Sequence, residues 1–446
     1  MARISGPLAA ALLIVSLNIA WVISDVGPYD VNWRQWRGRH GTGLASGTAP
    51  LRWSDSDNVK WKVEIPGRGH SSPIIWGDQI FLTTAIPISS EAATSADSSE
   101  QPQRRGSGGA GPLVEHRFEV ISIDRRTGDV RWRRTATVDT PHEGFHRMYG
   151  SFASNSPVTD GQRLYAFFGS RGIYCYDLDG NLLWEKDLEV RMQMRLQFGE
   201  GVAPVVAGDS LILNFDHEGD SFLVVLDKLN GDERWRASRD EASSWAMPVV
   251  LTHDGLEQVI VSATNKVRSY DLKTGEIIWE CAGLGTNVIP TPIHYRGMVI
   301  VMSGHRNPNL MAIRLGGRGD LTDSEAIVWS ESRGTSYTAS PVLHEGTLYF
   351  LTDSGMMSSF DAETGRPHYH QVRLPGPYNF KASPVGAGGM LYLASEEGDI
   401  IVVKAGSAFE VLATNKMEGH VFISSPAIAG GDIYLRSQTH LFAIGD

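Results

Sequence analysis

The sequence predicts an all-β fold, an eight-bladed β-propeller built from four-stranded antiparallel blades. Three observations predict it. A proline-led hairpin pattern recurs eight times, a strand ending in Asp and a Gly turn follow in most copies, and the two ends of the chain supply complementary parts of one unit. The composition agrees, because 48 glycines among 446 residues provide turns and 41% apolar residues provide a core.

The first two strands of each unit follow the proline. Copies read SPVTDGQRLYAFF from Ser156, SPVLHEGTLYFLT from Ser340 and SPVGAGGMLYLAS from Ser383. A short apolar run, a turn with Gly or Asp and an alternating run are typical of a tight β-hairpin, and proline fits the first residue of a strand. The eight copies start at Pro73, Pro157, Pro204, Pro248, Pro292, Pro341, Pro384 and Pro426, with spacings of 84, 47, 44, 44, 49, 43 and 42 residues.

The other two strands are marked by an Asp and by an aromatic residue. Segments such as RSYDLKTGE from Arg268 and SSFDAETGR from Ser358 read as a strand, a Gly turn and the start of the next strand. We expect the ring of the fourth strand to pack between neighbouring blades. These rings are Trp132, Trp184, Trp235, Trp279, Trp329 and Tyr369, with Leu412 in the seventh copy.

The eighth copy ends after three strands, at HLFAIGD. The stretch VKWKVEIP, from Val59 to Pro66, has the fourth-strand pattern with Trp61 in the ring position, and it precedes the first copy. An N-terminal strand that completes the last blade would close the ring and remove a free sheet edge. A solenoid would not explain why each end supplies what the other lacks.

The N-terminal region predicts export. Residues 1–24 combine Arg3 with an apolar run from Leu8 to Ile23, the pattern of a signal peptide or a membrane anchor. We therefore expect a periplasmic, cell-envelope or secreted protein that contacts a membrane only through such an anchor. Residues 25–58 form a lead-in and residues 59–446 the propeller, in which residues 86–115 hold a Ser-, Gly- and Pro-rich stretch that predicts a disordered loop.

Charge and motifs argue against several functions. The net charge of −11, with no long basic run, disfavours nucleic-acid binding. Cys175 and Cys281 fall in non-adjacent units, which predicts buried thiols rather than a disulfide. No Gly-x-Ser-x-Gly elbow or triad spacing suggests a hydrolase.

Two short motifs resemble metal sites only superficially. HEGFH contains His142, Glu143 and His146, but Gly144 disfavours the helix that a zinc motif needs, so we predict no metal there. The acidic DHEGD at residues 216–220 reads as a solvated hairpin rather than a calcium loop.

Strand order assigns the connections to two faces. The first-to-second and third-to-fourth turns share one face and are tight, except for GGRGDLTDSE at residues 316–325. The other face collects residues 86–115, 136–154 and 187–199, and long loops over a channel mouth often build a binding site. The last two, with TPHEGFHRMYGSFASNS and EVRMQMRLQFGEG, are the more informative.

The residues that enter each first strand should ring the same mouth. They are His70, Asn155, Glu200, Trp245, Thr291, Tyr337, Lys381 and Ser424. Charged, amide, imidazole and aromatic groups together suit a polar planar ligand. The candidate binding residues are therefore His70, Asn155, Glu200, Trp245, Tyr337 and Lys381. In the alternative interpretation, all eight residues only line a water-filled channel, and no catalytic residue is assigned in either case.

The YDLKTGEIIW and FDAETGR segments resemble the repeat of the pyrroloquinoline quinone (PQQ) family of propellers, and the similarity covers nearly everything after the N-terminal segment. NWRQWRGRHGTG, IPGRGHSSPIIWGDQIFLTTA and FISSPAIAGGDIYLRSQTHLFAIGD are similar to bacterial PQQ-binding-like repeat proteins. The wider family includes quinoprotein dehydrogenases, with PQQ and calcium in the channel mouth, and BamB-type lipoproteins that bind no quinone. The chain lacks the adjacent cysteine pair and haem motif of the former and the anchor cysteine of the latter.

The resemblance implies two functions. The first is an exported non-enzymatic binding or scaffold protein, without a cofactor, whose long-loop mouth receives a protein or polysaccharide partner. The alternative is a PQQ- and calcium-dependent dehydrogenase of alcohols or sugars. In that case Trp245 would stack on the quinone, Lys381 would pair with a quinone oxygen or carboxylate, and Glu200 with Asn155 would hold calcium.

Overall fold

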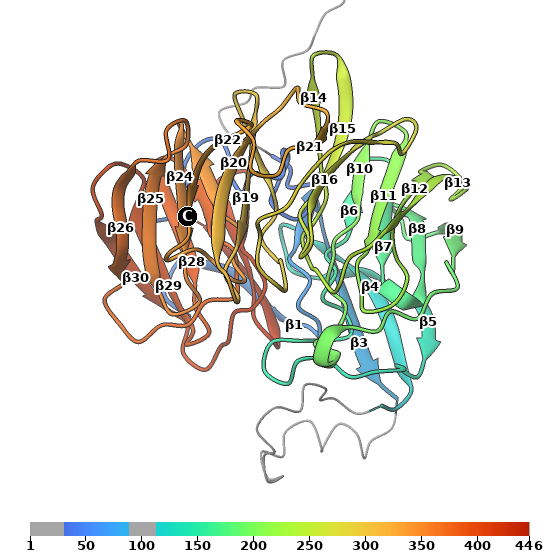
Figure 1. The fold of residues 1–446 in the computed structure, drawn as a ribbon. Helices are drawn as coiled ribbons and strands as arrows, with labels where there is room; N and C mark the ends of the chain where they lie inside the picture. Colours follow the sequence, from blue (N-terminus) through green and yellow to red (C-terminus); the bar gives the residue numbers. More distant parts are fainter. Residues whose placement is uncertain (1–30, 89–112, 446) are drawn as a thin grey trace, which may run out of the picture.

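The computed structural model describes residues 31–88 and 113–445. The predicted signal or anchor at residues 1–24 and most of the predicted loop at residues 86–115 lie outside the described residues. Within the described part, the strands form eight sheets in a ring, so the eight-bladed all-β propeller is confirmed (Figure 1). Two short 3-10 helices, η1 (Gly169–Arg171) and η2 (Arg195–Gln197), are also described.

The blades are numbered in the order of the eight prolines, and each contains four antiparallel strands. Blade 1 has β2 (Ile74–Trp76), β3 (Gln79–Pro87), β4 (His116–Asp124) and β5 (Val130–Asp139); blade 2 has β6 (Val158–Thr159), β7 (Arg163–Phe167), β8 (Ile173–Asp177) and β9 (Leu182–Lys186). Blade 3 has β10 (Val205–Ala207), β11 (Ser210–Phe215), β12 (Ser221–Asp227) and β13 (Glu233–Arg239); blade 4 has β14 (Val249–His253), β15 (Leu256–Val261), β16 (Val267–Asp271) and β17 (Ile277–Cys281).

The second half repeats the plan. Blade 5 has β18 (Ile293–Tyr295), β19 (Met298–Ser303), β20 (Asn309–Arg314) and β22 (Ile327–Glu331); blade 6 has β23 (Val342–His344), β24 (Thr347–Leu351), β25 (Met356–Asp361) and β26 (Pro367–Arg373). Blade 7 has β27 (Val385–Ala387), β28 (Met390–Ala394), β29 (Asp399–Lys404) and β30 (Val411–Lys416); blade 8 has β31 (Ala427–Ala429), β32 (Asp432–Arg436), β33 (His440–Ile444) and β1 (Val59–Glu64).

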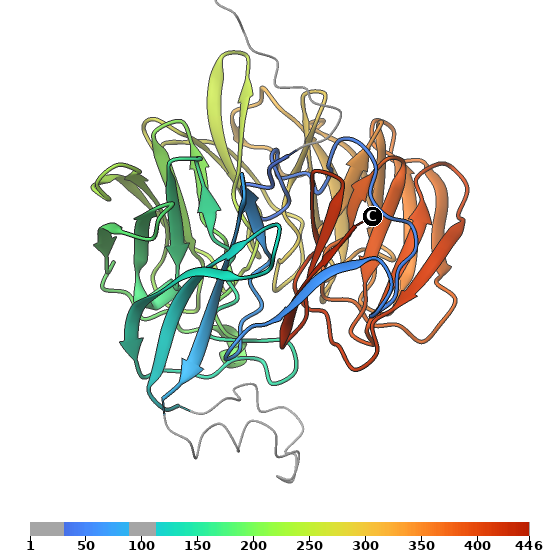
Figure 2. The same cartoon turned by 180° about the vertical axis from the view of Figure 1, so that it is seen from behind.

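The predicted closure is also confirmed. Strand β1 pairs antiparallel with β33, with Trp61 opposite Ala443 and Glu64 opposite His440. Figure 2 shows the blue N-terminal strand beside the red C-terminal strands. The two ends of the chain therefore build one sheet, and blade 8 gains an outer strand that the C-terminal segment does not supply.

Some connections differ from the sequence prediction. Strand β3 runs to Pro87 and β5 to Asp139, so the loops predicted from Ile86 and Ala136 begin later. The exceptional turn at residues 316–325 contains a short strand, β21 (Gly319–Asp320), which pairs in parallel with β17. The sheet of blade 4 therefore has a fifth strand, which comes from the third-to-fourth connection of blade 5.

The apolar core lies between the blades. One cluster joins Val158 and Phe167 of blade 2 to Leu213 and Phe222 of blade 3, and comparable clusters lie at the other blade contacts. Each sheet thus buries both faces against its neighbours, which explains the long apolar runs of inner strands such as β11 and β12. Cys175 and Cys281 are buried free thiols in separate clusters, as predicted.

Most fourth-strand tryptophans bind to the third-to-fourth turn of the next blade. The Trp235 indole Nε1 donates to Leu272 O at 2.9 Å, and its ring covers Gly275 in the third-to-fourth turn of blade 4. The same arrangement joins Trp61 to Gly128, Trp132 to Gly180, Trp184 to Gly231 and Trp329 to Gly365. Trp279 is the exception, because the turn that it faces in blade 5 is the longer one that forms β21.

The residue before each repeat proline ties the inner strands together. The Ser425 hydroxyl accepts the backbone N–H of Ser383 at 2.9 Å, and the Ser72 hydroxyl accepts that of Ser425 at 2.9 Å. Ser156, Ser340 and Ser383 accept from the preceding blade in the same way. Ala203 and Met247 carry no hydroxyl at this position, and the Thr291 hydroxyl has no hydrogen-bond partner within the described residues, so the belt is incomplete at blades 3, 4 and 5.

The lead-in covers the tight-turn end of the channel. Trp33 forms a β-bridge with Ile75 of blade 1, and Leu44 forms one with Gly386 of blade 7. Between them, the buried Arg37 guanidinium donates to the carbonyls of Pro341 and Pro384. Among the described residues, no helix has the length and apolar character to cross a bilayer.

Candidate functional site

A cavity of about 510 Å³ lies at the long-loop mouth of the channel. Its walls come from the loops that follow β5, β9 and β19 and from the segments that enter the first strands, while Trp36 comes from the lead-in on the opposite side. This volume suits a small molecule or a few side chains of a partner.

The third residue before every repeat proline lines this cavity. The eight residues are His70, Ser154, Gly201, Trp245, Ile289, Thr338, Lys381 and Ile423. Many residues directly before the proline line it as well, including Ser72, Met247 and Ser425. Alternate residues of an extended segment share a side, so positions one and three before the proline face the channel together.

Five of the six candidate binding residues line the cavity: His70, Glu200, Trp245, Tyr337 and Lys381. Asn155 stands two positions before Pro157, faces the other side of the segment and lines a separate hollow of about 10 Å³. Thr291 and Ser424 of the predicted ring are buried and do not line the cavity either. The expected ring was therefore out of register in these blades, where Ser154, Ile289 and Ile423 take the places at the mouth.

The Lys381 ammonium is already paired. Its Nζ lies 2.5 Å from Asp353 Oδ2 and 4.0 Å from Glu396 Oε1, and 4.2 Å from the centre of the Tyr149 ring. Asp353 in turn accepts hydrogen bonds from N and Oγ1 of Thr338. Lys381 is held in place by this network, and part of its charge is neutralised before any ligand binds.

Tyr149 organises the wall beside Lys381. Its ring stacks on His146, with ring centres 4.5 Å apart, and His146 meets Phe198 edge-on at 4.9 Å. The Tyr149 carbonyl accepts the Nδ1–H of His70 at 2.8 Å. Burial, followed by the charge of Arg68, lowers the pKa of His70 to about 3, so its imidazole is neutral at physiological pH.

Arg195 and Arg306 bring unpaired positive charge to the rim. Arg195 opens η2, Arg306 follows β19, and both line the cavity. Neither guanidinium has a hydrogen-bond or ion-pair partner within the described part of the chain. Burial and then these two charges lower the pKa of His305, which stacks on Tyr337 at 5.0 Å. Guanidinium groups beside aromatic rings suit a carboxylate or phosphate.

Two apolar side chains of the mouth loops are exposed: Leu196, which lines the cavity, and Met148, which precedes Tyr149. Leu196 is 56% exposed and Met148 is 59% exposed. Leu196 and the next residue, Gln197, both adopt a positive φ, of 51° and 53°, in η2. Two consecutive non-glycine residues in this region store backbone strain, which often accompanies binding segments.

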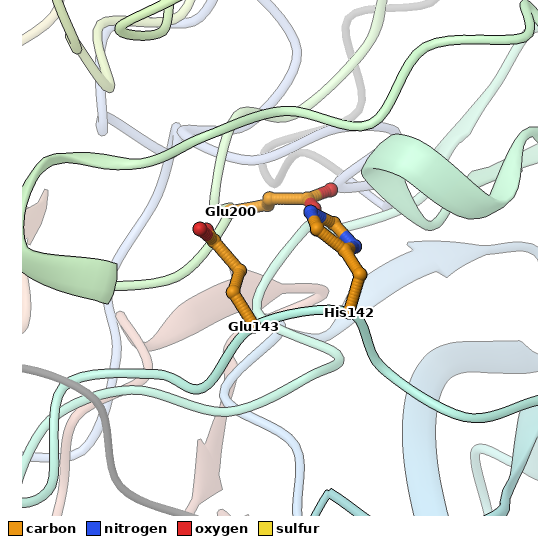
Figure 3. Close-up of side chains that lie close together, drawn as sticks. All are labelled: His142, Glu143 and Glu200. Atoms are coloured by element: carbon orange, nitrogen blue, oxygen red, sulfur yellow. The ribbon is translucent and has the colours of Figure 1, made fainter.

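A second cluster lies behind the cavity. His142 and Glu143 of the loop after β5 meet Glu200, and the three side chains offer ligand atoms within 4.8 Å of one another (Figure 3). Both Glu200 oxygens accept from Ser170, one from its N at 2.6 Å and one from its Oγ at 2.7 Å. Burial, with a smaller contribution from Glu200, raises the pKa of Glu143 to about 7. Of the HEGFH residues, His142 and Glu143 belong to this group, whereas His146 does not.

The sequence prediction missed Tyr149, Phe198, Arg195, His305 and Arg306. The first three fall in the two loop segments that the sequence marked as informative, but no repeat position singles them out. His305 and Arg306 lie in a short loop after β19, where no repeat position or motif marks them in the sequence. Alternate residues of an extended segment share a side, so counting back one and three residues from each proline would have identified the residues that face the channel.

A family model described as outer membrane protein assembly factor BamB matches residues 116–282, 219–318 and 319–444. The chain belongs to this BamB-like family of PQQ-repeat β-propellers. No curated protein sequence matches it significantly.

Solved structures of PQQ-repeat propellers share the fold. BamB from Moraxella catarrhalis is 11% identical with a TM-score of 0.55, covering 86% of this chain and 98% of that one. A europium-containing methanol dehydrogenase is 9% identical with a TM-score of 0.63, covering 93% and 98%. Quinohemoprotein alcohol dehydrogenase from Comamonas testosteroni is 9% identical with a TM-score of 0.59, covering 93% and 81%. At such identities the likeness concerns the fold alone.

Proposed function

We propose that this PQQ-repeat propeller is an exported, non-enzymatic binding protein whose long-loop mouth receives an acidic segment of a protein partner. The observation that carries the proposal is the pair of guanidinium groups at the rim of the cavity, Arg195 and Arg306, which lack a partner among the described residues. The whole chain carries a net charge of −11, so free cations at this mouth are a local feature of the surface. A complementary acidic segment would be steered to them.

The composition of the mouth supports a protein partner over a polysaccharide. Arginine, tryptophan, tyrosine and methionine are enriched in protein interfaces, and Arg195, Trp245, Tyr337 and Met148 lie in or beside the cavity. The exposed Leu196 and Met148 would bury apolar surface against a protein segment, which a sugar chain would not do as well. The family description, an assembly factor for outer membrane proteins, also supports a protein partner.

Export is supported by the sequence pattern of the first residues and by the family description. The apolar run from Leu8 to Ile23 follows Arg3, as in a signal peptide or anchor, although these residues lie outside the described part. The family description, which refers to the outer membrane, agrees with a location in the cell envelope.

The alternative, a PQQ- and calcium-dependent dehydrogenase, needs the quinone and its calcium ligands in one cavity. Trp245 offers an aromatic wall, but Asn155 of the expected calcium pair faces the separate hollow. The Lys381 ammonium, expected to meet the quinone, is held by Asp353 at 2.5 Å. The residues of the mouth therefore do not fit a calcium-bound quinone.

Fluorescence anisotropy with a labelled peptide of alternating glutamate and phenylalanine tests the proposal. We expect saturable binding by the wild-type protein and none with the peptide that has lysine in place of glutamate. Arg195→Gln and Arg306→Gln should each weaken binding at least about tenfold, since a hydrogen bond to a charged group contributes about 1.5–3 kcal/mol. Arg366→Gln is the matched control, because Arg366 is exposed in a turn on the opposite face.

Three results would contradict the proposal. Binding of the acidic peptide that Arg195→Gln and Arg306→Gln leave unchanged would place it elsewhere on the protein. Binding of glucuronate oligomers with no binding of the peptide would assign a polysaccharide partner. Dye reduction with an alcohol or sugar after addition of PQQ and calcium would establish the dehydrogenase instead.

A further inference from the structure

The loop after β5 and the segment that enters blade 3 meet in a small polar hollow behind the mouth. Glu143, Asn155 and Glu200 line this hollow, whose volume of about 10 Å³ is room for one water-sized sphere. His142 reaches the same group, since its imidazole and the two carboxylates lie within 4.8 Å of one another (Figure 3). An imidazole and two carboxylates at such separations are typical ligands of a divalent metal.

Asn155 provides a second, independent observation. The residue is 4% exposed and lines the hollow, and its side-chain amide makes no hydrogen bond within the described part of the chain. The amide is not among the fully buried polar atoms that lack a partner, so it remains open to a ligand in the hollow. A ligand in the hollow that accepts electron density from the amide oxygen would satisfy it.

The side chains around the hollow carry more negative than positive charge, which favours a bound cation. Arg171 approaches from one side, with Nη1 3.7 Å from Glu200 Oε1 and Nε 3.4 Å from Asp139 Oδ2. One guanidinium therefore faces three carboxylates, those of Asp139, Glu143 and Glu200. Ser170 uses one lone pair of each Glu200 oxygen, which leaves the others available.

We propose that His142, Glu143 and Glu200, with the Asn155 amide oxygen, bind one divalent first-row metal ion such as Zn²⁺ or Mn²⁺. The imidazole favours these ions over Ca²⁺ and Mg²⁺, which prefer sites made of oxygen alone. His142 Nε2 lies 2.7 Å from Met192 O, where it donates a hydrogen bond in the metal-free protein. In this tautomer Nδ1 carries the lone pair that binds the metal, and the hydrogen bond from Nε2–H to Met192 O orients the ring.

The metal would join the two loops that frame the mouth. His142 and Glu143 belong to the loop that carries His146 and Tyr149, and Glu200 ends the segment that carries Arg195 and Phe198. Glu143 already links the same two segments, because its carboxylate accepts the backbone N–H of Met194 at 3.1 Å. Metal binding would therefore stabilise the rim. The link between the metal and partner binding rests on the proposed function. The metal site itself does not depend on that function.

Isothermal titration calorimetry of the EDTA-treated full chain with ZnCl₂, MnCl₂, CaCl₂ and MgCl₂ tests the proposal. We expect one equivalent of Zn²⁺ or Mn²⁺ to bind more tightly than Ca²⁺ or Mg²⁺ and to raise the melting temperature. Glu143→Gln and His142→Asn should each lower the affinity at least about tenfold. His294→Gln, a histidine at β18, is the matched control and should bind as the wild type does.

Circular dichroism of each variant shows whether it folds, and the wild-type titration decides the case even if a variant does not. No binding of Zn²⁺ or Mn²⁺ by the wild type would overturn the proposal, as would binding that Glu143→Gln and His142→Asn leave intact. Metal binding without any effect on the glutamate–phenylalanine peptide would keep the metal site and remove its link to the mouth. Failure of the peptide to bind would leave the metal titration unaffected.

Discussion

Replacing Gly275 with alanine should disrupt the contact between blades 3 and 4. Gly275 has a φ of +76°, and a Cβ there would lie 2.6 Å from Cε3 and 2.7 Å from Cδ2 of Trp235. The indole cannot easily move aside, because its Nε1 is bonded to Leu272 O at 2.9 Å and its ring packs among Val225, Tyr270 and other core residues. The substitution therefore combines an unfavourable backbone conformation with a steric clash.

Gly255 separates these two contributions. It has nearly the same φ, +77°, in the β14–β15 turn of the same blade, and no atom of the described residues lies within 4 Å of the point where a Cβ would stand. An L-residue at such a φ costs about 1–2 kcal/mol, partly offset by about 0.4–1 kcal/mol from the stiffer unfolded chain. Overpacking against the indole adds about 1–3 kcal/mol at Gly275 alone.

Urea unfolding followed by tryptophan fluorescence measures the difference. We expect Gly255→Ala to lower the free energy of unfolding by about 1 kcal/mol or less, and Gly275→Ala by about 2–4 kcal/mol. Equal losses for the two variants would refute the claim that the tryptophan–glycine contact holds adjacent blades together. A larger loss for Gly255→Ala would refute it as well.

Three further predictions concern buried polar groups, each checked by urea unfolding. Asp216→Asn should lower the free energy of unfolding by about 3–5 kcal/mol, because Asp216 pairs with the fully buried Arg239 at 2.6 Å; a loss below about 1 kcal/mol would contradict this. Ser425→Ala should cost about 1–3 kcal/mol, since the N–H of Ser383 loses its acceptor, and an unchanged midpoint would show that the serine belt is unimportant. The neutral His70, with its pKa lowered to about 3, favours the folded state above about pH 6.5, and this contribution is lost as the pH falls toward 3. His70→Asn should therefore reduce the difference in unfolding free energy between pH 7 and pH 5 by about 2 kcal/mol, and an unchanged difference would show that folding does not lower the pKa of His70.

The repeat made the fold predictable from sequence. Each proline, Asp-Gly turn and fourth-strand tryptophan marks a strand by local chemistry, and Trp61 reveals the closing strand because it appears before the first proline. The fifth strand of blade 4 was not predictable, since Gly319 and Asp320 pair with β17 only once blades 4 and 5 are side by side.

The site was predictable only in part. Trp245 and Lys381 were placed correctly because they stand three positions before a proline, whereas Asn155 stands two before it and faces the other way. Tyr149 and Arg195 come from irregular loops whose path no periodicity describes. Ion pairing could not be predicted from the sequence, because Lys381 and Arg306 are both cations. Only the structure shows that Lys381 pairs with Asp353, whereas the Arg306 guanidinium has no partner among the residues that the structure describes.

A charge exchange at the mouth tests the central claim most directly. The wild-type protein and an Arg195→Glu, Arg306→Glu double variant would each be titrated with the glutamate–phenylalanine and lysine–phenylalanine peptides at the same ionic strength. If these two guanidinium groups recognise an acidic partner, the wild type binds the glutamate peptide and the double variant prefers the lysine peptide. A double variant that folds and still prefers the glutamate peptide would contradict the account.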